Sequence, residues 1–156
     1  MEAKVTWQGG MKLDGTADSG FHVPLSARLA YGGDEQGFTP MELIAIGLAG
    51  CTAMDVIAIL QKKRQEVTAF EVRAHIQRAA EHPRVFTQAV IEYYVTGRGV
   101  DEEAVRRSIE LSATRYCPAT AMFRRVFTME LKYYLFEAGE DEAPQLIKSG
   151  ELVFLM

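Results

Sequence analysis

The sequence predicts an α+β fold in which an antiparallel sheet packs against helices. Residues 41–60 are almost entirely apolar and have the length of a long helix. Residues 69–79 and 84–96 alternate apolar and polar side chains, which is typical of antiparallel strands that cover a core on one side. A second helix is predicted to begin at Asp101, with glutamates in its first turn. The length of 156 residues fits a single domain, residues 1–156.

The acidic composition argues against nucleic acid as a partner. The formal net charge is -4, whereas phosphate binding needs a concentrated basic surface. The first residues have no basic head followed by an apolar run, so they do not indicate a secretion signal. Only two cysteines occur, Cys51 and Cys117, and a chain of this length does not need a disulfide scaffold. We therefore expect a cytoplasmic protein.

The histidines and cysteines do not have the spacing of a metal site. None of His22, His75 and His82 lies within four residues of a cysteine. His75 falls on the polar face of a predicted strand and His82 falls in a turn, where a solvated histidine is the expected case. We therefore expect no metal and no cofactor.

The N-terminal part is predicted to form a small sheet. Residues 3–9 and 11–17 have the pattern of a hairpin with a Gly-Gly turn. Residues 21–29 add a third strand, which Pro24 confines to an edge because proline cannot donate a ladder hydrogen bond. A turn-rich loop over 31–40 leads to the long helix.

The long helix has a clear start and very few charges. Thr39 followed by Pro40 predicts its first residues, since a hydroxyl caps free N–H groups and proline suits the first helical position. The run 41–60 carries only two charges, Glu42 and Asp55. Its length suits a membrane span, but a single acid-bearing span without basic asymmetry is a poor one, so we expect no membrane contact. A helix that is apolar nearly all round is buried on all sides, which predicts cover from a second subunit.

The second half of the chain continues with a helix and a strand. The helix that begins at Asp101 stops before Cys117 and the proline that follows it. If a short helix covers 118–123, Cys117 is its N-cap, where the positive end of the helix dipole lowers the pKa of a thiol. Residues 126–136 are predicted to form the last core strand, and the apolar stretch 152–155 is either an edge strand or a partner contact.

Cys51 lies in the middle of the long helix, close to Gly47 and Gly50. Glycine inside a helix costs roughly 1 kcal/mol relative to alanine, so both glycines need an explanation. One explanation is helix–helix packing between two subunits. The other is the close approach of a ligand or another backbone to the helix face near Cys51. Because a free cysteine is most often a small buried hydrophobic residue, composition alone does not make either cysteine reactive.

Two segments resemble the OsmC/Ohr family of osmotically inducible and organic hydroperoxide resistance proteins. The sequence GFTPMELI at 37–44, followed by GLAGCT at 47–52, resembles the family's helix with the peroxidatic cysteine. The sequence YCP at 116–118 resembles the family's second cysteine, and the order of elements matches over nearly the whole chain. The resemblance implies an intertwined homodimer in which antiparallel sheets wrap around central buried helices.

The resemblance also implies a chemistry, that of a thiol-dependent peroxidase acting in oxidative-stress defence. Its substrate is an organic hydroperoxide or, less well, hydrogen peroxide. Cys51 is then the peroxidatic thiolate, which becomes a sulfenic acid, and Cys117 is the resolving cysteine, which forms a disulfide with it. An external dithiol reduces the pair again. In the family, an arginine and a glutamate hold the thiolate.

The chain departs from the family pattern around that arginine and glutamate. Glu42 stands one residue later than the family's glutamate. It precedes Cys51 by nine residues, which places it on the opposite face of the helix. Glu42 is therefore a candidate for the catalytic role or for stabilising the helix N-terminus. Arg28 is the candidate arginine by its position before the helix, and an ordinary surface arginine is an equal alternative. Asp55, four residues after Cys51, is expected to raise the pKa of its thiol unless the carboxylate is paired with an arginine or caps a neighbour.

A second function is open from the sequence. A non-catalytic dimer that binds a small apolar or electrophilic ligand would have a pocket near the two helix glycines and an unreactive Cys51. For the peroxidase, three aromatic residues, Trp7, Phe21 and Tyr31, are expected either to line an apolar pocket for a hydroperoxide tail or to belong to an aromatic core. The reactivity of Cys51 toward thiol reagents distinguishes the binding protein from the peroxidase.

Overall fold

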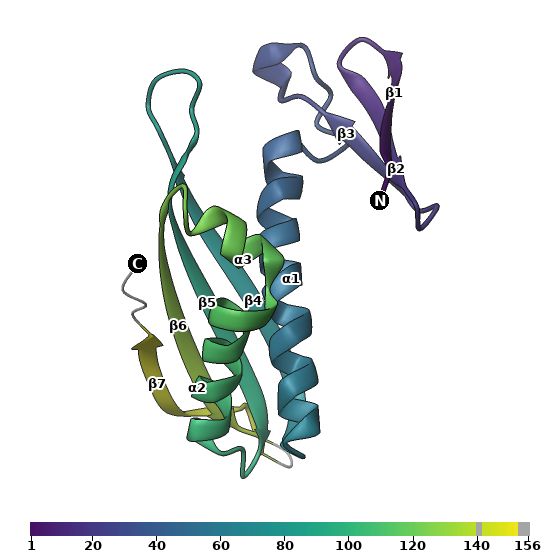
Figure 1. Ribbon diagram of the computed structural model, residues 1–156. Coiled ribbons are helices and arrows are strands. Elements are labelled where there is room, and N and C mark those ends of the chain that lie inside the picture. Colours follow the sequence, from purple (N-terminus) through teal and green to yellow (C-terminus); the bar gives the residue numbers. More distant parts are fainter. Residues whose placement is uncertain (140–141, 153–156) are drawn as a thin grey trace. The chain divides into compact units, whose positions relative to one another are not determined.

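The computed structural model describes residues 1–139 and 142–152 (Figure 1). The chain divides into two compact units, Met1–Ile46 and Gly47–Met156, and the boundary falls inside helix α1, Pro40–Lys62. Helices and sheets are both present, so the α+β prediction is confirmed. The predicted start of the long helix at Thr39 and Pro40 is confirmed as well.

The first unit contains a three-stranded antiparallel sheet in the order β1-β2-β3. Its strands are β1, Ala3–Gly9, β2, Lys12–Ala17, and β3, His22–Ser26. The hairpin turn is made by Gly9 and Gly10, whose φ angles of 104° and 55° lie in the region that glycine adopts without strain. Pro24 lies on the edge strand β3, as the sequence predicts. The 3-10 helix η1, Leu29–Tyr31, follows.

The three aromatic residues of this unit do not form a core in the single chain. Trp7, Phe21 and Tyr31 are 69%, 82% and 61% exposed. The reason is that β1 is open to solvent on both of its faces, while Phe21 lies just before β3 and Tyr31 ends η1. The core interpretation is therefore wrong for one subunit, and a pocket lined by these residues stays a prediction.

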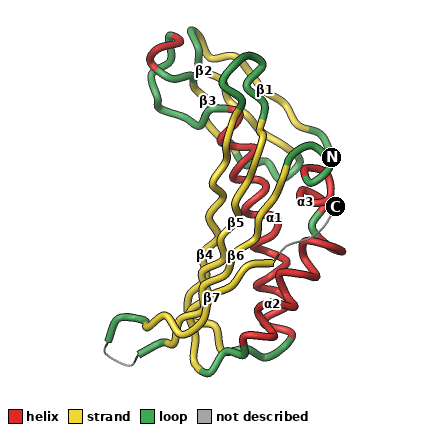
Figure 2. Tube along the Cα trace, turned by 90° about the vertical axis from the view of Figure 1, so that its left-hand side faces the viewer, coloured by secondary structure: helices red, strands yellow, loops and turns green. Residues whose placement is uncertain are grey.

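The second unit contains a four-stranded sheet in the order β4-β5-β6-β7 (Figures 1 and 2). Its strands are β4, Glu66–Arg78, β5, Phe86–Arg98, β6, Thr128–Glu137, and β7, Gln145–Leu152. The expectation of an antiparallel sheet needs one correction, because β5 and β6 run parallel. Parallel neighbours need a long crossover connection. Here it consists of α2, Glu102–Leu111, a π-helical segment η2, Ser112–Tyr116, and α3, Pro118–Phe123.

The helices of the second unit cover one face of this sheet. Tyr93, on the buried face of β5, reaches Thr52 of α1 with its hydroxyl. Tyr133, on the buried face of β6, donates a hydrogen bond to Glu102 of α2 at 2.6 Å. Burial and this carboxylate raise the pKa of Tyr133 to about 12. Both helices therefore pack on the same side of the sheet.

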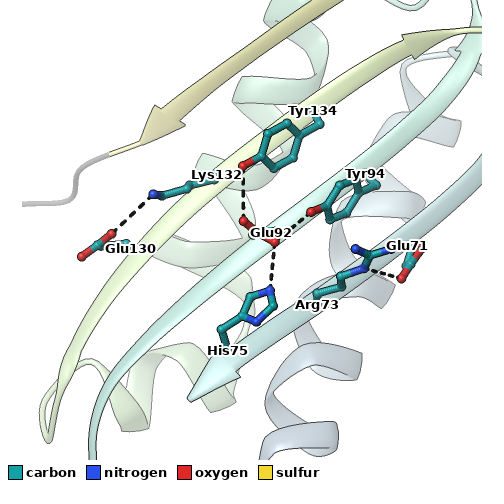
Figure 3. A network of polar contacts seen from close by, with 8 residues as sticks. All are labelled: Glu71, Arg73, His75, Glu92, Tyr94, Glu130, Lys132 and Tyr134. Carbon is teal, nitrogen blue, oxygen red and sulfur yellow. Dashed lines mark hydrogen bonds and ion pairs between the residues drawn. The ribbon is translucent and has the colours of Figure 1, made fainter. Parts of the chain in front are cut away.

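The opposite face of the sheet is polar and centres on Glu92 (Figure 3). Its carboxylate accepts hydrogen bonds from the hydroxyls of Tyr94 and Tyr134 and contacts the ring Nε2 of His75 at 2.9 Å. The Tyr94 hydroxyl in the first place, together with His75 and Tyr134, lowers the pKa of Glu92. Arg73 lies 4.4 Å above the ring of Tyr94. His75 thus lies on an exposed polar face, as predicted.

Helix α1 buries only one stripe within the chain described. The buried residues, spaced four apart, are Leu48, Thr52, Val56 and Leu60. Met54, on another face, is 74% exposed. The helix is long and apolar enough to cross a membrane by length and composition, which is weak evidence because core helices of soluble proteins share these properties. The expectation of burial on all sides is therefore not met by one chain.

The C-terminal edge of the sheet is β7, which pairs antiparallel with β6. Of the apolar stretch 152–155, Leu152 belongs to this edge strand. Residues 153–156 lie outside the described residues, so a partner contact of this stretch stays a prediction.

Candidate functional site

The structure brings Cys51 and Cys117 together. Cys51 lies in α1 and Cys117 lies between η2 and α3, and Cys117 is one of the groups that raise the pKa of the Cys51 thiol, so the two side chains are close neighbours. Both cysteines are free. Cys117 is only 2% exposed, whereas Cys51 is half-buried. Cys51 is therefore the thiol that a molecule from solvent can reach first.

Cys117 is the N-cap of α3, as the sequence predicts. Its sulfur accepts a hydrogen bond from the backbone N–H of Thr120 at 3.3 Å, and Pro118 occupies the first helical position. The backbone N–H of Ala119, in the same helical turn, lowers the pKa of the Cys51 thiol. The first turn of α3 thus acts on both thiols.

A π-helical segment positions Cys117. In η2 the backbone N–H of Cys117 donates to the carbonyl oxygen of Ser112 at 2.9 Å, a bond that spans five residues instead of the usual four. Single π-helical turns are frequent at functional sites. The segment ends in extended backbone at Cys117, where α3 then begins.

The surroundings of Cys51 disfavour its ionised form. Burial is the largest effect that raises the pKa of the Cys51 thiol. The Cys117 thiol and the negative charge of Asp55 raise this pKa further, while the N–H of Ala119 lowers it. The predicted effect of Asp55 on Cys51 is confirmed. Among the described residues, no arginine contributes to this shift.

Asp55, which is half-buried, lies at the end of a chain of buried polar side chains that was not predicted from the sequence. Its carboxylate accepts a hydrogen bond from the hydroxyl of Ser112 at 3.1 Å. Ser112 in turn lies 2.9 Å from the hydroxyl of Thr52, which lies 2.7 Å from the hydroxyl of Tyr93. Each of these three residues is a polar group inside an apolar pattern. Because buried polar groups need partners, that pattern is the signal that could have revealed the chain.

Glu42 and Arg28 belong to the first unit. The carboxylate of Glu42 accepts hydrogen bonds from the backbone N–H of Thr39 at 2.7 Å and from its hydroxyl at 2.9 Å. This is the capping arrangement of a helix N-terminus, and these two bonds, with a smaller effect of the Arg28 charge, lower the pKa of Glu42. Arg28 is exposed and directly precedes η1. The helix-stabilising role of Glu42 is therefore observed, and catalytic roles of Glu42 and Arg28 stay predictions.

Within 1–139 and 142–152, no three His, Cys, Asp or Glu residues converge as ligands for a metal ion. The first unit has a shallow pocket of about 390 Å³. Its lining includes Asp34, whose carboxylate pairs with the ammonium group of Lys12 and accepts a hydrogen bond from the hydroxyl of Ser26. The two cysteines are not among its lining residues.

Comparison with known proteins places the chain in a family. Residues 32–142 match the family described as OsmC-like protein. The chain belongs to the OsmC-like family. Protein YhfA of Escherichia coli (strain K12) is 35% identical to it over 138 residues, which are 88% of this chain and 100% of YhfA. OsmC-like proteins are soluble, so α1 is best understood as the apolar helix of a soluble OsmC-like protein.

Solved structures share the OsmC-like fold. A hypothetical protein from Aquifex aeolicus VF5 has a TM-score of 0.77 and 24% identity, covering 88% of this chain and 97% of its own. The organic hydroperoxide resistance protein OhrB of Bacillus subtilis has a TM-score of 0.58 and 20% identity, covering 85% of this chain and 98% of its own. At these identities the likeness concerns the fold alone.

Proposed function

We propose that this OsmC-like protein is a cytoplasmic thiol peroxidase for organic hydroperoxides in oxidative-stress defence, with Cys51 as the peroxidatic and Cys117 as the resolving cysteine. The observation that carries the proposal is the proximity of two free thiols from separate segments of the chain. The fold shared with an organic hydroperoxide resistance protein supports it. The greater exposure of Cys51 supports its assignment as the attacking thiol.

The proposed reaction has three balanced steps. The Cys51 thiolate attacks a peroxide oxygen, the O–O bond breaks, and the leaving alkoxide takes a proton to become an alcohol. The Cys117 thiol then attacks the sulfenic sulfur of Cys51, forming the disulfide while its proton leaves with the hydroxyl as water. An external dithiol returns two electrons by thiol–disulfide exchange and is itself oxidised to a disulfide.

The proposal requires a positive group that offsets the raised pKa of Cys51. Arg28 is our candidate, because its charge already acts on Glu42. In this proposal Glu42 orients the guanidinium, and the guanidinium stabilises the thiolate. Replacing Arg28 by lysine retains the positive charge but removes the planar guanidinium with its several N–H donors. This substitution therefore separates the effect of the charge from the effect of the guanidinium geometry.

The deciding experiment is stopped-flow oxidation of the reduced protein by cumene hydroperoxide and by hydrogen peroxide. We expect rapid consumption of one equivalent of cumene hydroperoxide, slower consumption of hydrogen peroxide, and a product that has lost two hydrogens by mass. Slow reaction with both peroxides would refute the peroxidase.

The raised pKa of Cys51 favours a second candidate, a non-catalytic dimer that binds a small apolar or electrophilic ligand. In that case Cys51 is a high-pKa thiol in a binding site and peroxide turnover is absent. Alkylation by iodoacetamide across a pH series separates the two functions. A thiol that stays unreactive at neutral pH in the assembled protein supports the binding protein.

We also propose that the protein is a homodimer joined along α1. Gly50 is exposed in the single chain, and a methyl group added there meets no atom within 4 Å. In an isolated chain, Gly50→Ala should therefore stabilise the helix by roughly 1 kcal/mol. If a second α1 packs there, the methyl group instead overpacks the interface at a cost of about 1 kcal/mol, which raises the dissociation constant of the dimer roughly fivefold.

We expect the second outcome for Gly50→Ala, measured by sedimentation equilibrium. The concentration dependence of the melting temperature provides an internal control, since only a dimer melts at a higher temperature when it is more concentrated. A monomeric protein stabilised by Gly50→Ala would contradict the dimer.

A further inference from the structure

A buried chain of polar side chains joins the two segments that carry the cysteines. We infer that this chain, formed by Tyr93, Thr52, Ser112 and Asp55, sets the separation of the Cys51 and Cys117 thiols, with Thr52 as its central positioning residue. The inference rests on the proposed function, because a thiol pair is what such spacing serves. It goes beyond that function by assigning a role to residues that do not touch the peroxide.

The hydrogen bonds of this chain all run in one direction. Ser112 donates its single hydroxyl proton to the carboxylate of Asp55. Ser112 must then accept from Thr52, and Thr52 must accept from Tyr93, because each hydroxyl has only one proton. Burial raises the pKa of Tyr93, so this phenol keeps its proton and acts as the first donor. The four side chains thus form a continuous series of hydrogen bonds that ends on the Asp55 carboxylate.

Each end of the central hydrogen bond is coupled to one cysteine. Thr52 directly follows Cys51 in α1, so its side chain fixes the rotation of the helix at that point. The carbonyl oxygen of Ser112 accepts the backbone N–H of Cys117 at 2.9 Å. The bond between the hydroxyls of Thr52 and Ser112 therefore connects the backbones on both sides of the thiol pair.

Burial makes this connection rigid. Thr52 is 1% and Ser112 is 0% exposed, so a hydroxyl that lost its partner here would remain unsatisfied. Apolar contacts tolerate a sliding of η2 along α1, whereas directional hydrogen bonds do not. Because a disulfide accepts only a narrow range of Cα separations, a small displacement of η2 is enough to weaken the pairing of the two sulfurs.

The test measures the pairing of the thiols without any peroxide. The full-length protein is equilibrated with mixtures of oxidised and reduced glutathione. In this exchange the two protein thiols become a disulfide and one oxidised glutathione becomes two reduced glutathiones. The oxidised fraction, measured by mass, gives the equilibrium constant. We expect Thr52→Val, which removes the hydroxyl but keeps the shape, to lower this constant about fivefold, which raises the reduction potential by about 20 mV.

Two controls separate positioning from general destabilisation. Thr52→Ser keeps the hydroxyl and is expected to restore the wild-type constant. Thr114→Val makes the same chemical change at an exposed residue of η2, where the hydroxyl bonds to the carbonyl oxygen of Glu110, and is expected to leave the constant unchanged. If Thr52→Val does not fold, Tyr93→Phe removes only the first donor and is expected to shift the constant in the same direction by less.

Three results would overturn the inference. They are an unchanged constant in Thr52→Val or its substitute Tyr93→Phe, an equal fall in Thr52→Ser, and the absence of a Cys51–Cys117 disulfide in the wild-type protein. A wild-type protein that forms the disulfide with glutathione but reacts slowly with peroxides refutes the peroxidase and leaves the positioning role intact.

Discussion

Replacement of Cys51 by serine is expected to slow the consumption of cumene hydroperoxide by roughly a thousandfold or more. The nucleophile of the proposed reaction is a thiolate, and a serine hydroxyl is far less ionised at neutral pH and cannot form a sulfenic acid. The measurement is the pseudo-first-order loss of peroxide under stopped flow. Cys51→Ser with wild-type activity would remove Cys51 from the mechanism.

Cys117→Ser is the matched control for that experiment. Because Cys117 is buried while Cys51 is half-buried, the variant should retain the first oxidation step. It should then stop at the sulfenic acid of Cys51, which dimedone captures and mass analysis detects. If Cys117→Ser instead loses the first step and Cys51→Ser keeps it, the two roles are reversed.

Asp55→Asn is expected to speed alkylation of Cys51 by iodoacetamide near neutral pH, because removing a negative charge close to the thiol lowers its pKa. The negative charge of Asp55 is one of the causes that raise the pKa of the Cys51 thiol. A raised pKa means less thiolate at a given pH, so the wild-type rate keeps rising with pH beyond the range of an ordinary thiol. Removing the charge moves the inflection of the profile to lower pH.

The substitution is selective because asparagine retains an oxygen that accepts the hydrogen bond from Ser112. Glu110→Gln serves as the charge-matched control, since Glu110 pairs with Arg107 on the exposed side of α2. This control should leave the alkylation profile of Cys51 in place. Equal profiles for the wild type and Asp55→Asn would show that burial and Cys117 alone set the reactivity.

Most elements of the fold could be predicted because local chemistry marks them. Thr39 and Pro40 predicted the start of α1, and the alternation of apolar and polar residues predicted β4 and β5. Cys117 followed by Pro118 gave the short helix α3 with its correct limits. The parallel pairing of β5 and β6 could not be predicted in this way, because it depends on how the crossover through α2 returns to the sheet.

The site was predictable only in part for a similar reason. The two cysteines stand out as single residues, and the structure brings them together. The hydrogen bonds from Tyr93 through Thr52 to Ser112 join three separate segments, so no sequence spacing records them. Glu42 differs because its hydrogen bond with the backbone N–H of Thr39 joins residues that are close in the sequence. Its role at the helix N-terminus could therefore be predicted from the sequence.

The π-helical turn in η2 makes the site sensitive to chain length as well as to residue identity. A bond from Cys117 to Ser112 spans one residue more than an α-helical bond. Deleting any single residue between them would leave the spacing of an ordinary α-helical turn and would remove the wide turn that precedes Cys117. Such a deletion would change the backbone that leads into Cys117 while leaving both cysteines in the gene, so two intact cysteine codons do not by themselves guarantee a working thiol pair.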